Sequence, residues 1–225
     1  MSTTMNAMGT KGLGQDGQGQ PEALTVIFWG VCGSIATPGF DMVEYGGNTS
    51  CVEVQAGGHT LIFDTGTGVR LLGQKLLRER ASAERRGPLG AHIFYSHVHW
   101  DHIQGLPFFT PLFIPGTRLS FYGPKGDMPL GDVLRLQMSD PVFPVRLVDL
   151  ASQLSFTDLA DGARVALPRL DGGVGEVEIT CARLNHPGGV LAYRVSCGGR
   201  AVVYATDTEH YSCPDPKLVR QCRDA

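Results

Sequence analysis

The amino-acid sequence predicts a single α/β domain, and three observations support this fold class. The chain has 225 residues, of which 42% are hydrophobic, and this is enough apolar material for one sizeable core. Apolar runs of strand length recur along the chain and end in turn-forming residues. Between them, residues 69–77 and 130–138 carry the apolar spacing of amphipathic helices. Strand and helix patterns that share one core indicate an α/β domain.

Each element is expected where its pattern begins and ends. Apolar or alternating runs predict strands at 24–29, 51–55, 59–63, 91–95, 119–122, 154–156, 163–167, 174–184, 191–197 and 201–206. Gly57-Gly58 is typical of a hairpin turn between the second and third strands. Apolar stripes predict helices after Gly66-Thr67-Gly68 and over 130–138, and a shorter helix within 215–222. Residues 106–115 hold three phenylalanines and three prolines and are expected either to wall a pocket or to fill the core.

Two segments carry neither strand nor helix patterns. Residues 1–22 are rich in Gly, Gln, Ser and Thr, which predicts a flexible tail in front of a domain at 23–225. Residues 30–48 form a long Gly- and Pro-containing loop, and loops of this length inside a compact domain are usually functional or mobile.

Charge and cysteine content narrow the class of protein. The formal net charge is -3 and the pI is about 6.1, so no basic surplus points to a nucleic-acid partner. None of the six cysteines forms a Cys-x-x-Cys pair, and several lie in strand-like runs, where a free thiol behaves as a small hydrophobe. The sequence shows no signal-peptide pattern and no apolar stretch long enough to span a membrane. We therefore expect a reduced, cytoplasmic protein.

The most informative run is residues 97–102, which read His-Val-His-Trp-Asp-His. His97, His99, Asp101 and His102 offer imidazole and carboxylate groups, the ligands that zinc, manganese and iron accept in proteins. The run follows the apolar strand pattern at 91–95, so a strand end supports it. A solvated His-rich loop is the simpler interpretation.

Three further ligand types also follow apolar runs, and they favour a metal site over a solvated loop. Asp64 follows 59–63, His186 follows 174–184, and Asp207 follows 201–206. Strands of one sheet that end at the same edge would bring these side chains to residues 97–102. One Asp after a strand is an ordinary turn residue, but four such coincidences in one chain indicate a metal centre.

The spacing predicts how two metals share these ligands. His97 and His99 alternate, so an extended segment directs both to one metal, with His186 as the best third imidazole. Asp101 and His102 lie beyond the turn and can serve a second metal, and Asp207 is the natural bridge. Two metals hold a hydroxide between them and lower its pKa, and this bridging hydroxide would be the nucleophile. Asp101 and Asp207 are thus expected to be catalytic as well as metal-binding.

Asp64 is expected to act behind the ligands as an acceptor that orients a ligand imidazole. The alternative is a helix N-cap for the residues that follow it. The neighbouring Gly66-Thr67-Gly68 could bind a phosphate at a helix start, although a tight turn beneath the metals is the preferred interpretation.

These residues resemble the metallo-β-lactamase-fold superfamily of metal-dependent hydrolases, from residue 24 to the end of the chain. The resemblance implies a four-layer αβ/βα sandwich of two mixed β-sheets with outer helices. Further runs are similar to the phosphodiesterase branch, which includes class II cyclic-nucleotide and cyclic-phosphate phosphodiesterases and tRNA 3′-end endonucleases. They are Trp29-Gly30-Val31-Cys32-Gly33-Ser34, Tyr45-Gly46-Gly47-Asn48-Thr49-Ser50-Cys51, Trp100 and Thr206-Asp207-Thr208-Glu209.

The resemblance therefore implies a phosphodiesterase that cleaves a small cyclic-nucleotide or phosphodiester substrate with two divalent metals, zinc by preference or else manganese or iron. Three alternatives stay open: a thioester, lactone or β-lactam hydrolase, a tRNA 3′-end-type nuclease, and a non-catalytic metal-binding module. A bridging Asp207 disfavours a true β-lactamase, because the family generally has Cys there.

The sequence departs from the family pattern after Asp207. Family members supply a further His to the second metal, well downstream, and this chain has none before Ala225. The expectation is a C-terminally truncated fold that lacks its last elements, with a second site that is incomplete unless His210 replaces the missing ligand. An exposed strand edge and apolar face would then favour association, such as a homodimer.

Overall fold

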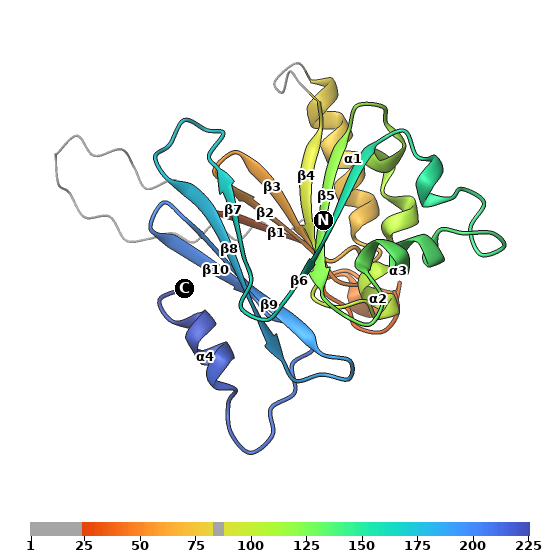
Figure 1. The fold of residues 1–225 in the computed structure, drawn as a ribbon. Coiled ribbons are helices and arrows are strands. Elements are labelled where there is room, and N and C mark those ends of the chain that lie inside the picture. The colour runs from red at the N-terminus through yellow and green to blue at the C-terminus, as the bar shows by residue number, and fades with distance from the viewer. Residues whose placement is uncertain (1–23, 83–87) are drawn as a thin grey trace.

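The protein is described here by a computed structural model that covers residues 24–82 and 88–225, so the expected tail at 1–22 lies outside the described residues. Two β-sheets pack face to face, and helices cover the outer face of each sheet (Figure 1). The predicted four-layer α/β sandwich is confirmed. Among the described residues, no helix has the length and apolar character needed to cross a membrane.

The first sheet has six strands in the order β1-β2-β3-β4-β5-β6. They are β1 (Thr25–Gly30), β2 (Cys51–Ala56), β3 (His59–Phe63), β4 (Gly90–Phe94), β5 (Arg118–Pro124) and β6 (Gln153–Leu159). The first three pair antiparallel, and β3 to β6 pair in parallel. Parallel pairing needs long crossovers. Those crossovers carry α1 (Val69–Ala81), α2 (Trp100–Ile103) and α3 (Leu130–Gln137).

The second sheet has four strands in the order β10-β9-β8-β7, and all of them pair antiparallel. They are β7 (Arg164–Pro168), β8 (Glu176–Leu184), β9 (Val190–Cys197) and β10 (Arg200–Tyr204). The expectation of two mixed sheets is corrected here: short turns join these strands, and a short turn can only reverse the chain. The helix α4 (Pro216–Cys222) covers the outer face, where its Leu218 packs against a small buried cluster.

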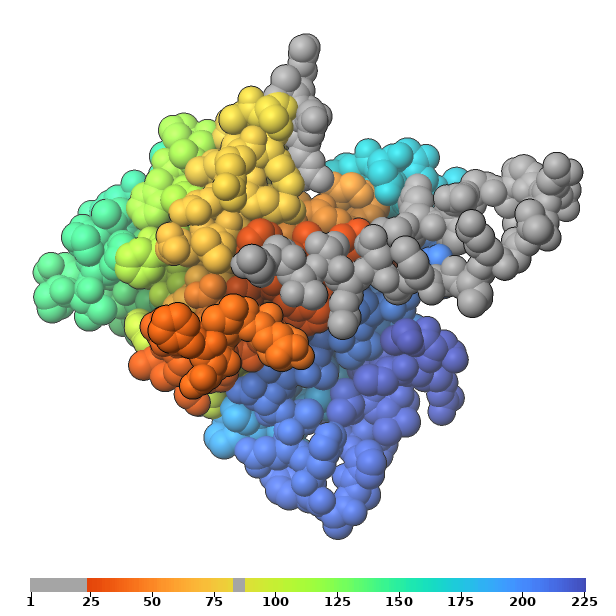
Figure 2. All heavy atoms as spheres, turned by 180° about the vertical axis from the view of Figure 1, so that it is seen from behind, coloured from red at the N-terminus to blue at the C-terminus, as the bar shows by residue number. Residues whose placement is uncertain are grey.

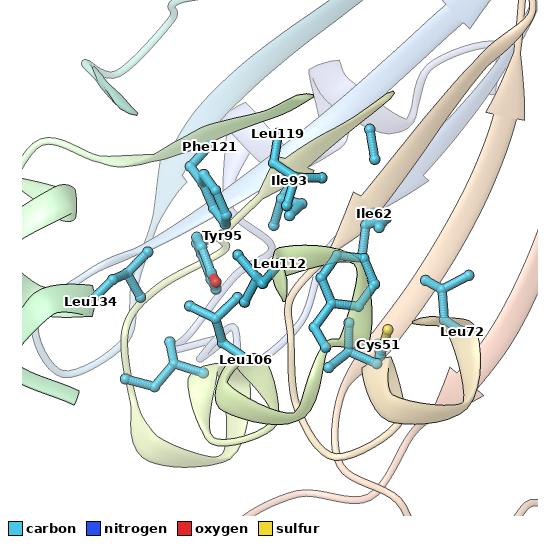
Figure 3. Close-up of a cluster of buried hydrophobic side chains, with 14 of the residues drawn as sticks. Cys51, Ile62, Leu72, Ile93, Tyr95, Leu106, Leu112, Leu119, Phe121 and Leu134 are labelled. Carbon is cyan, nitrogen blue, oxygen red and sulfur yellow. The ribbon is translucent and has the colours of Figure 1, made fainter. Parts of the chain in front are cut away.

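The first core lies between the six-stranded sheet and its helices (Figure 3). The apolar stripe predicted for α1 is buried there through Val69, Leu72 and Leu76. Tyr95, just after β4, stacks on Phe121 of β5 with ring centroids 6.4 Å apart. Burial of side chains of this size stabilises the fold by about 1.5–3 kcal/mol each.

Residues 106–115 fill this same core, which resolves the two interpretations of that segment. Leu106, Phe109 and Leu112 are fully buried in the 3-10 turns η2 (Leu106–Phe108) and η3 (Thr110–Phe113). Phe108, by contrast, is 58% exposed. The prolines suit these short turns because their fixed φ is compatible with the first positions of a helix.

The second core lies between the two sheets and ends next to the histidine run that follows β4. Phe63 and Phe94 stack at 5.4 Å, and both contact Tyr193 of β9. Tyr193 Oη donates to Tyr95 O at 2.6 Å, and Leu191 N donates to Ser96 O at 2.8 Å. These bonds hold the two sheets together directly next to the histidine run.

The long loop between β1 and β2 lies at the surface (Figure 2, orange). It contains one short 3-10 turn, η1 (Phe40–Met42), and exposes several large apolar side chains, namely Ile35, Phe40, Val43 and Tyr45. One of its contacts with the rest of the domain is the backbone N–H of Ser34, which donates to the carboxylate of Asp101 at 2.8 Å. The loop therefore borders the histidine run.

Candidate metal centre

Four strand ends supply the centre. Asp64 follows β3, the run 97–102 follows β4, His186 follows β8 and Asp207 follows β10. We expected one sheet edge to gather these side chains, but β8 and β10 belong to the second sheet. The donors therefore converge from both sheets. A pattern of apolar runs cannot reveal this, because it does not tell which strands pair.

The two aspartates turn the chain sharply after their strands. Asp64 has φ +59 and Asp207 has φ +49, in the left-handed region that Asp adopts more readily than most residues. Asp64 does not cap the following helix, because the N-cap of α1 is Gly68 and no side chain bonds there. Both carboxylates are instead directed towards the imidazoles.

The first group of donors is His97, His99 and His186. His99 Nδ1 lies 2.9 Å from His97 Nε2 and 3.1 Å from His186 Nε2. His97 is buried, whereas His99 is exposed, so the group opens to solvent on one side. A single ring proton can satisfy only one of the two short contacts of His99 Nδ1, and a cation among the three nitrogens would satisfy all of them.

The second group is His97, His102 and Asp207, so the two groups share one imidazole. Asp207 Oδ2 lies 3.3 Å from His102 Nε2, 3.7 Å from His97 Nε2 and 3.9 Å from His186 Nε2. One carboxylate oxygen is thus within 4 Å of imidazoles from both groups. Asp207 therefore lies between the two groups, and its role as a bridging ligand stays a prediction.

Asp101 lies at the edge of the second group rather than within it. Its Oδ2 is 3.4 Å from His102 Nε2 and also accepts the Ser34 N–H. His210 is exposed and belongs to neither group among the described residues. The chain therefore brings together His97, His99, His102, His186 and Asp207, with Asp101 beside them.

Asp64 connects the donors to the fold. It is fully buried, and its Oδ2 accepts hydrogen bonds from His102 Nδ1 at 2.8 Å and from Ser96 Oγ at 2.7 Å. Ser96 Oγ in turn lies 3.0 Å from His97 Nδ1. Because the carboxylate can only accept, the chain of bonds places the protons of His97 and His102 on Nδ1. The Nε2 atoms of both rings then face the centre.

The surroundings shift the charge of two imidazoles in opposite directions. Burial lowers the pKa of His97 to about 4, with help from the nearby charge of His102. Burial also works against His102, but its hydrogen bond to Asp64 and the charges of Asp64, Asp101 and Asp207 outweigh that effect and raise its pKa to about 9. For Asp207, burial raises the pKa, yet the Thr206 hydrogen bond and the histidine charges leave it below the usual value.

These donors fit a pair of divalent cations. His102 Nε2 is buried without a hydrogen-bond partner, although it faces two carboxylates. A buried polar atom of this kind is costly unless something occupies the space before it. Imidazole nitrogen and carboxylate oxygen together suit zinc, manganese or iron. The residues would hold one cation through the three-histidine group and another through His102, Asp207 and Asp101.

Two residues of the site were not predicted from the sequence. The hydroxyls of Ser96 and Tyr204 each donate a hydrogen bond to Asp64 Oδ2, both at 2.7 Å. The sequence signal for both residues is their closeness to predicted ligands: Ser96 directly precedes the histidine run, and Tyr204 ends the strand before Asp207. Their bonds to Asp64 could not be read from the sequence, because Asp64 is 32 residues from Ser96 and 140 residues from Tyr204.

The turn Gly66-Thr67-Gly68 is a support for the centre. Its amides already donate to backbone or hydroxyl oxygens: Gly66 N to Ser50 O, Thr67 N to Thr49 Oγ1 and Gly68 N to Thr49 O. A side chain at 66 would collide with Asp101 O at 2.5 Å. The turn therefore packs tightly under the histidine run, which is the interpretation preferred from the sequence over a phosphate site. Its amides are not free to bind a phosphate.

Known structures with a similar fold are distant in sequence. The metallo-β-lactamase fold protein YhfI from Bacillus subtilis gives a TM-score of 0.51 at 20% identity, covering 84% of this chain and 64% of that one. The short form of human tRNase Z (ELAC1) gives 0.51 at 22% identity, covering 79% and 67%. This chain thus spans about two thirds of the length of either protein. At these identities the likeness shows the fold alone.

Among curated proteins, no sequence matches this chain. A family model does match, and it covers residues 59–225, which include every donor described above. Because the match extends over most of the chain and the fold agrees, this protein belongs to the β-lactamase superfamily domain family.

Proposed function

We propose that this chain is a metal-dependent phosphodiesterase that cleaves a small phosphodiester or cyclic-nucleotide substrate. The observation that carries the proposal is the shared arrangement of donors: His97 belongs to both groups, and Asp207 Oδ2 lies within 4 Å of imidazoles from each. Such an arrangement suits two cations side by side. Two divalent cations bound there would supply positive charge against a phosphoryl oxygen and lower the pKa of an attacking water.

The chain's own residues prepare this chemistry. Asp64 and Ser96 fix the rings of His97 and His102, so their Nε2 atoms face the centre before any cation arrives. Ser34 N holds Asp101 in place from the surface loop. The exposed side of the centre, at His99 and Trp100, gives a substrate access to the donors, since Trp100 is 57% exposed.

Asp207 supports a phosphodiester over a β-lactam. A carboxylate at this position is a hard oxygen ligand that can contact both cations, whereas the true β-lactamases of the superfamily that the sequence resembles generally have the softer Cys there. The resemblance of residues 29–34, 45–51 and 206–209 to the phosphodiesterase branch points in the same direction. The thioester or lactone hydrolase has no comparable support from the geometry.

The test combines metal analysis with hydrolysis of bis(p-nitrophenyl) phosphate. The protein should bind two zinc or manganese ions per chain and release p-nitrophenol, and His99→Ala should lose a metal and at least about 100-fold in rate. His210→Ala is the matched control: the residue is exposed and lies in neither group, so metal content and rate should persist.

Two results would overturn the proposal. Full metal occupancy with no hydrolysis of any phosphodiester would indicate a metal-binding module. Turnover of a thioester or lactone in place of the phosphodiester would indicate a carbonyl hydrolase on the same fold.

A further inference from the structure

A small pocket adjoins the first group of donors. His97 and His99 form one side, and three other elements complete it: the end of β5, the start of α3 and the turn after β8. Its volume is about 110 Å³. Binding pockets for whole drug-sized ligands are several times larger, so this space suits one substituent of a substrate.

The pocket carries two cationic side chains and no carboxylate. Lys125 directly follows β5, and Arg183 is the last residue but one of β8. The other two lysines among the described residues are paired, Lys75 with Glu53 at 2.5 Å and Lys217 with Asp161 at 2.6 Å. Within the described ranges, Lys125 is the lysine without an acidic partner. In a chain of net charge -3, two cations that line a pocket beside the donors, with no carboxylate in that lining, need an explanation.

The position of Arg183 is built into the fold. Its Nη2 donates to Gly188 O at 2.8 Å, which lays the guanidinium across the turn that carries His186. Gly189 has φ +83, and a side chain there would come within 2.5 Å of Arg183 Nε. Glycine at 189 therefore makes room for the guanidinium. Only one of the five N–H groups of Arg183 is used by this contact, and the others remain available to an anion.

The third wall of the pocket is apolar. Met128, Leu130 and Val133 line it from the start of α3. The helix start itself does not hold an anion, because Leu130 N already donates to Asp158 Oδ1 at 2.9 Å. Side-chain cations and an apolar wall together fit a short organic group with a negatively charged end.

We infer that Lys125 and Arg183 form a subsite for a second anionic group of the substrate, a phosphomonoester or a carboxylate. This inference rests on the proposed function, since the scissile phosphodiester would lie at the donors while the second anion lies in the pocket. The preferred substrate is then a small phosphodiester that carries a further negative charge. A guanidinium contacts such a group through paired hydrogen bonds, and an ammonium adds a point charge.

The experiment measures binding of two probes to the protein supplied with zinc, by titration calorimetry. The probes are thymidine 5′-phosphate and thymidine 3′,5′-bisphosphate, which differ by one anionic group. The bisphosphate should bind about tenfold more tightly, because a hydrogen-bonded charge contact of this kind contributes about one such factor. This ratio should collapse towards one in Lys125→Gln and Arg183→Gln.

The matched control is Arg200→Gln, since Arg200 is an exposed cation at the start of β10, outside the pocket. It should keep the tenfold ratio. Equal binding of both probes by the parent protein, or an unchanged ratio in both pocket variants, overturns the inference.

Hydrolysis of bis(p-nitrophenyl) phosphate in the same samples separates the two proposals. Turnover without a preference for the bisphosphate leaves the phosphodiesterase standing and removes the subsite. A preference that depends on Lys125 and Arg183 without turnover supports the subsite and removes the phosphodiesterase.

Discussion

The hydroxyl of Tyr204 donates a hydrogen bond to Asp64 Oδ2 at 2.7 Å, and this contact joins the last strand of the second sheet to a turn of the first. Asp64 in turn accepts from His102 Nδ1 at 2.8 Å. Tyr204 thus acts on a donor imidazole through one carboxylate, without reaching the centre itself. The orientation of His102 depends on residues from both sheets.

Tyr204→Phe should weaken metal binding while the fold persists. The substitution removes one hydrogen bond to Asp64 and leaves the ring in place against Phe63. Loss of an outer partner of a ligand imidazole typically reduces metal affinity by about tenfold or more. Competition with a chromogenic zinc chelator measures the change.

The control for this variant is Tyr193→Phe. Its hydroxyl also donates across the sheets, to Tyr95 O at 2.6 Å, but it does not touch Asp64. It should lower stability by about 1 kcal/mol and leave zinc affinity unchanged. Equal effects of the two variants on affinity would show that Tyr204 acts only through general stability.

Asp64→Asn should reduce metal affinity by about 10–100-fold, because a neutral amide no longer favours a proton on His102 Nδ1. The residue has φ +59, and Asn also adopts that conformation readily, so the backbone should persist. In the metal-free variant the pKa of His102 should fall from about 9, which NMR titration of its ring protons would detect. Asp161→Asn, which changes a surface carboxylate paired with Lys217, is the control.

The two buried histidines predict how the stability of the metal-free protein varies with pH. The folded-state pKa of His102 is about 9, above the ordinary 6.5, so its contribution is complete below about pH 6.5 and is lost as pH rises to about 9. The pKa of His97 is about 4, so the unfolded chain binds that proton first, and stability also falls as pH drops from about 6.5 to 4.

Urea unfolding in the presence of a chelator should therefore show maximal stability near pH 6.5, as far as these two groups decide it. Zinc should shift the maximum upward, because binding at His102 requires the neutral ring and releases its proton. A stability of the metal-free protein that stays constant from pH 6.5 to 9 would contradict the assignment for His102.

Gly105→Ala should damage both stability and metal binding. A side chain at 105 would lie 2.1 Å from Gly66 O, so the histidine run would have to move away from the turn beneath it. Such overpacking typically costs about 1–3 kcal/mol. Thermal melts and zinc titration measure the two effects. Gly39→Ala is the control, since nothing lies within 4 Å of a side chain at that position.

The elements of the fold were predictable because strands that bury one or both faces leave alternating or continuous apolar runs in the sequence. The runs at 24–29, 51–55 and 59–63 became β1, β2 and β3 with bounds shifted by one residue at most. The stripe after residue 68 became α1. Strand pairing was not predictable in the same way, and the antiparallel second sheet and the two-sheet origin of the donors followed only from the structure.

The residue types of the candidate site were predictable from the sequence, but the contacts that hold those residues in place were less so. The alternation of His97 and His99 placed them together, and the structure brings His186 to them. Asp101 was expected in the second group, and the structure places it at the edge of that group, because the chain turns into α2 after His99 and Ser34 holds the carboxylate from a distant loop. That His97 and Asp207 bind metal stays a prediction until metal content is measured.

The origin of the donors in two sheets has a thermodynamic consequence. A cation held by His99 and His186 joins a loop of the first sheet to a turn of the second, much as a covalent cross-link would. Metal at 100 times its dissociation constant would raise the free energy of unfolding by about 2.7 kcal/mol. The melting temperature of this protein would thus report the concentration of free metal around it.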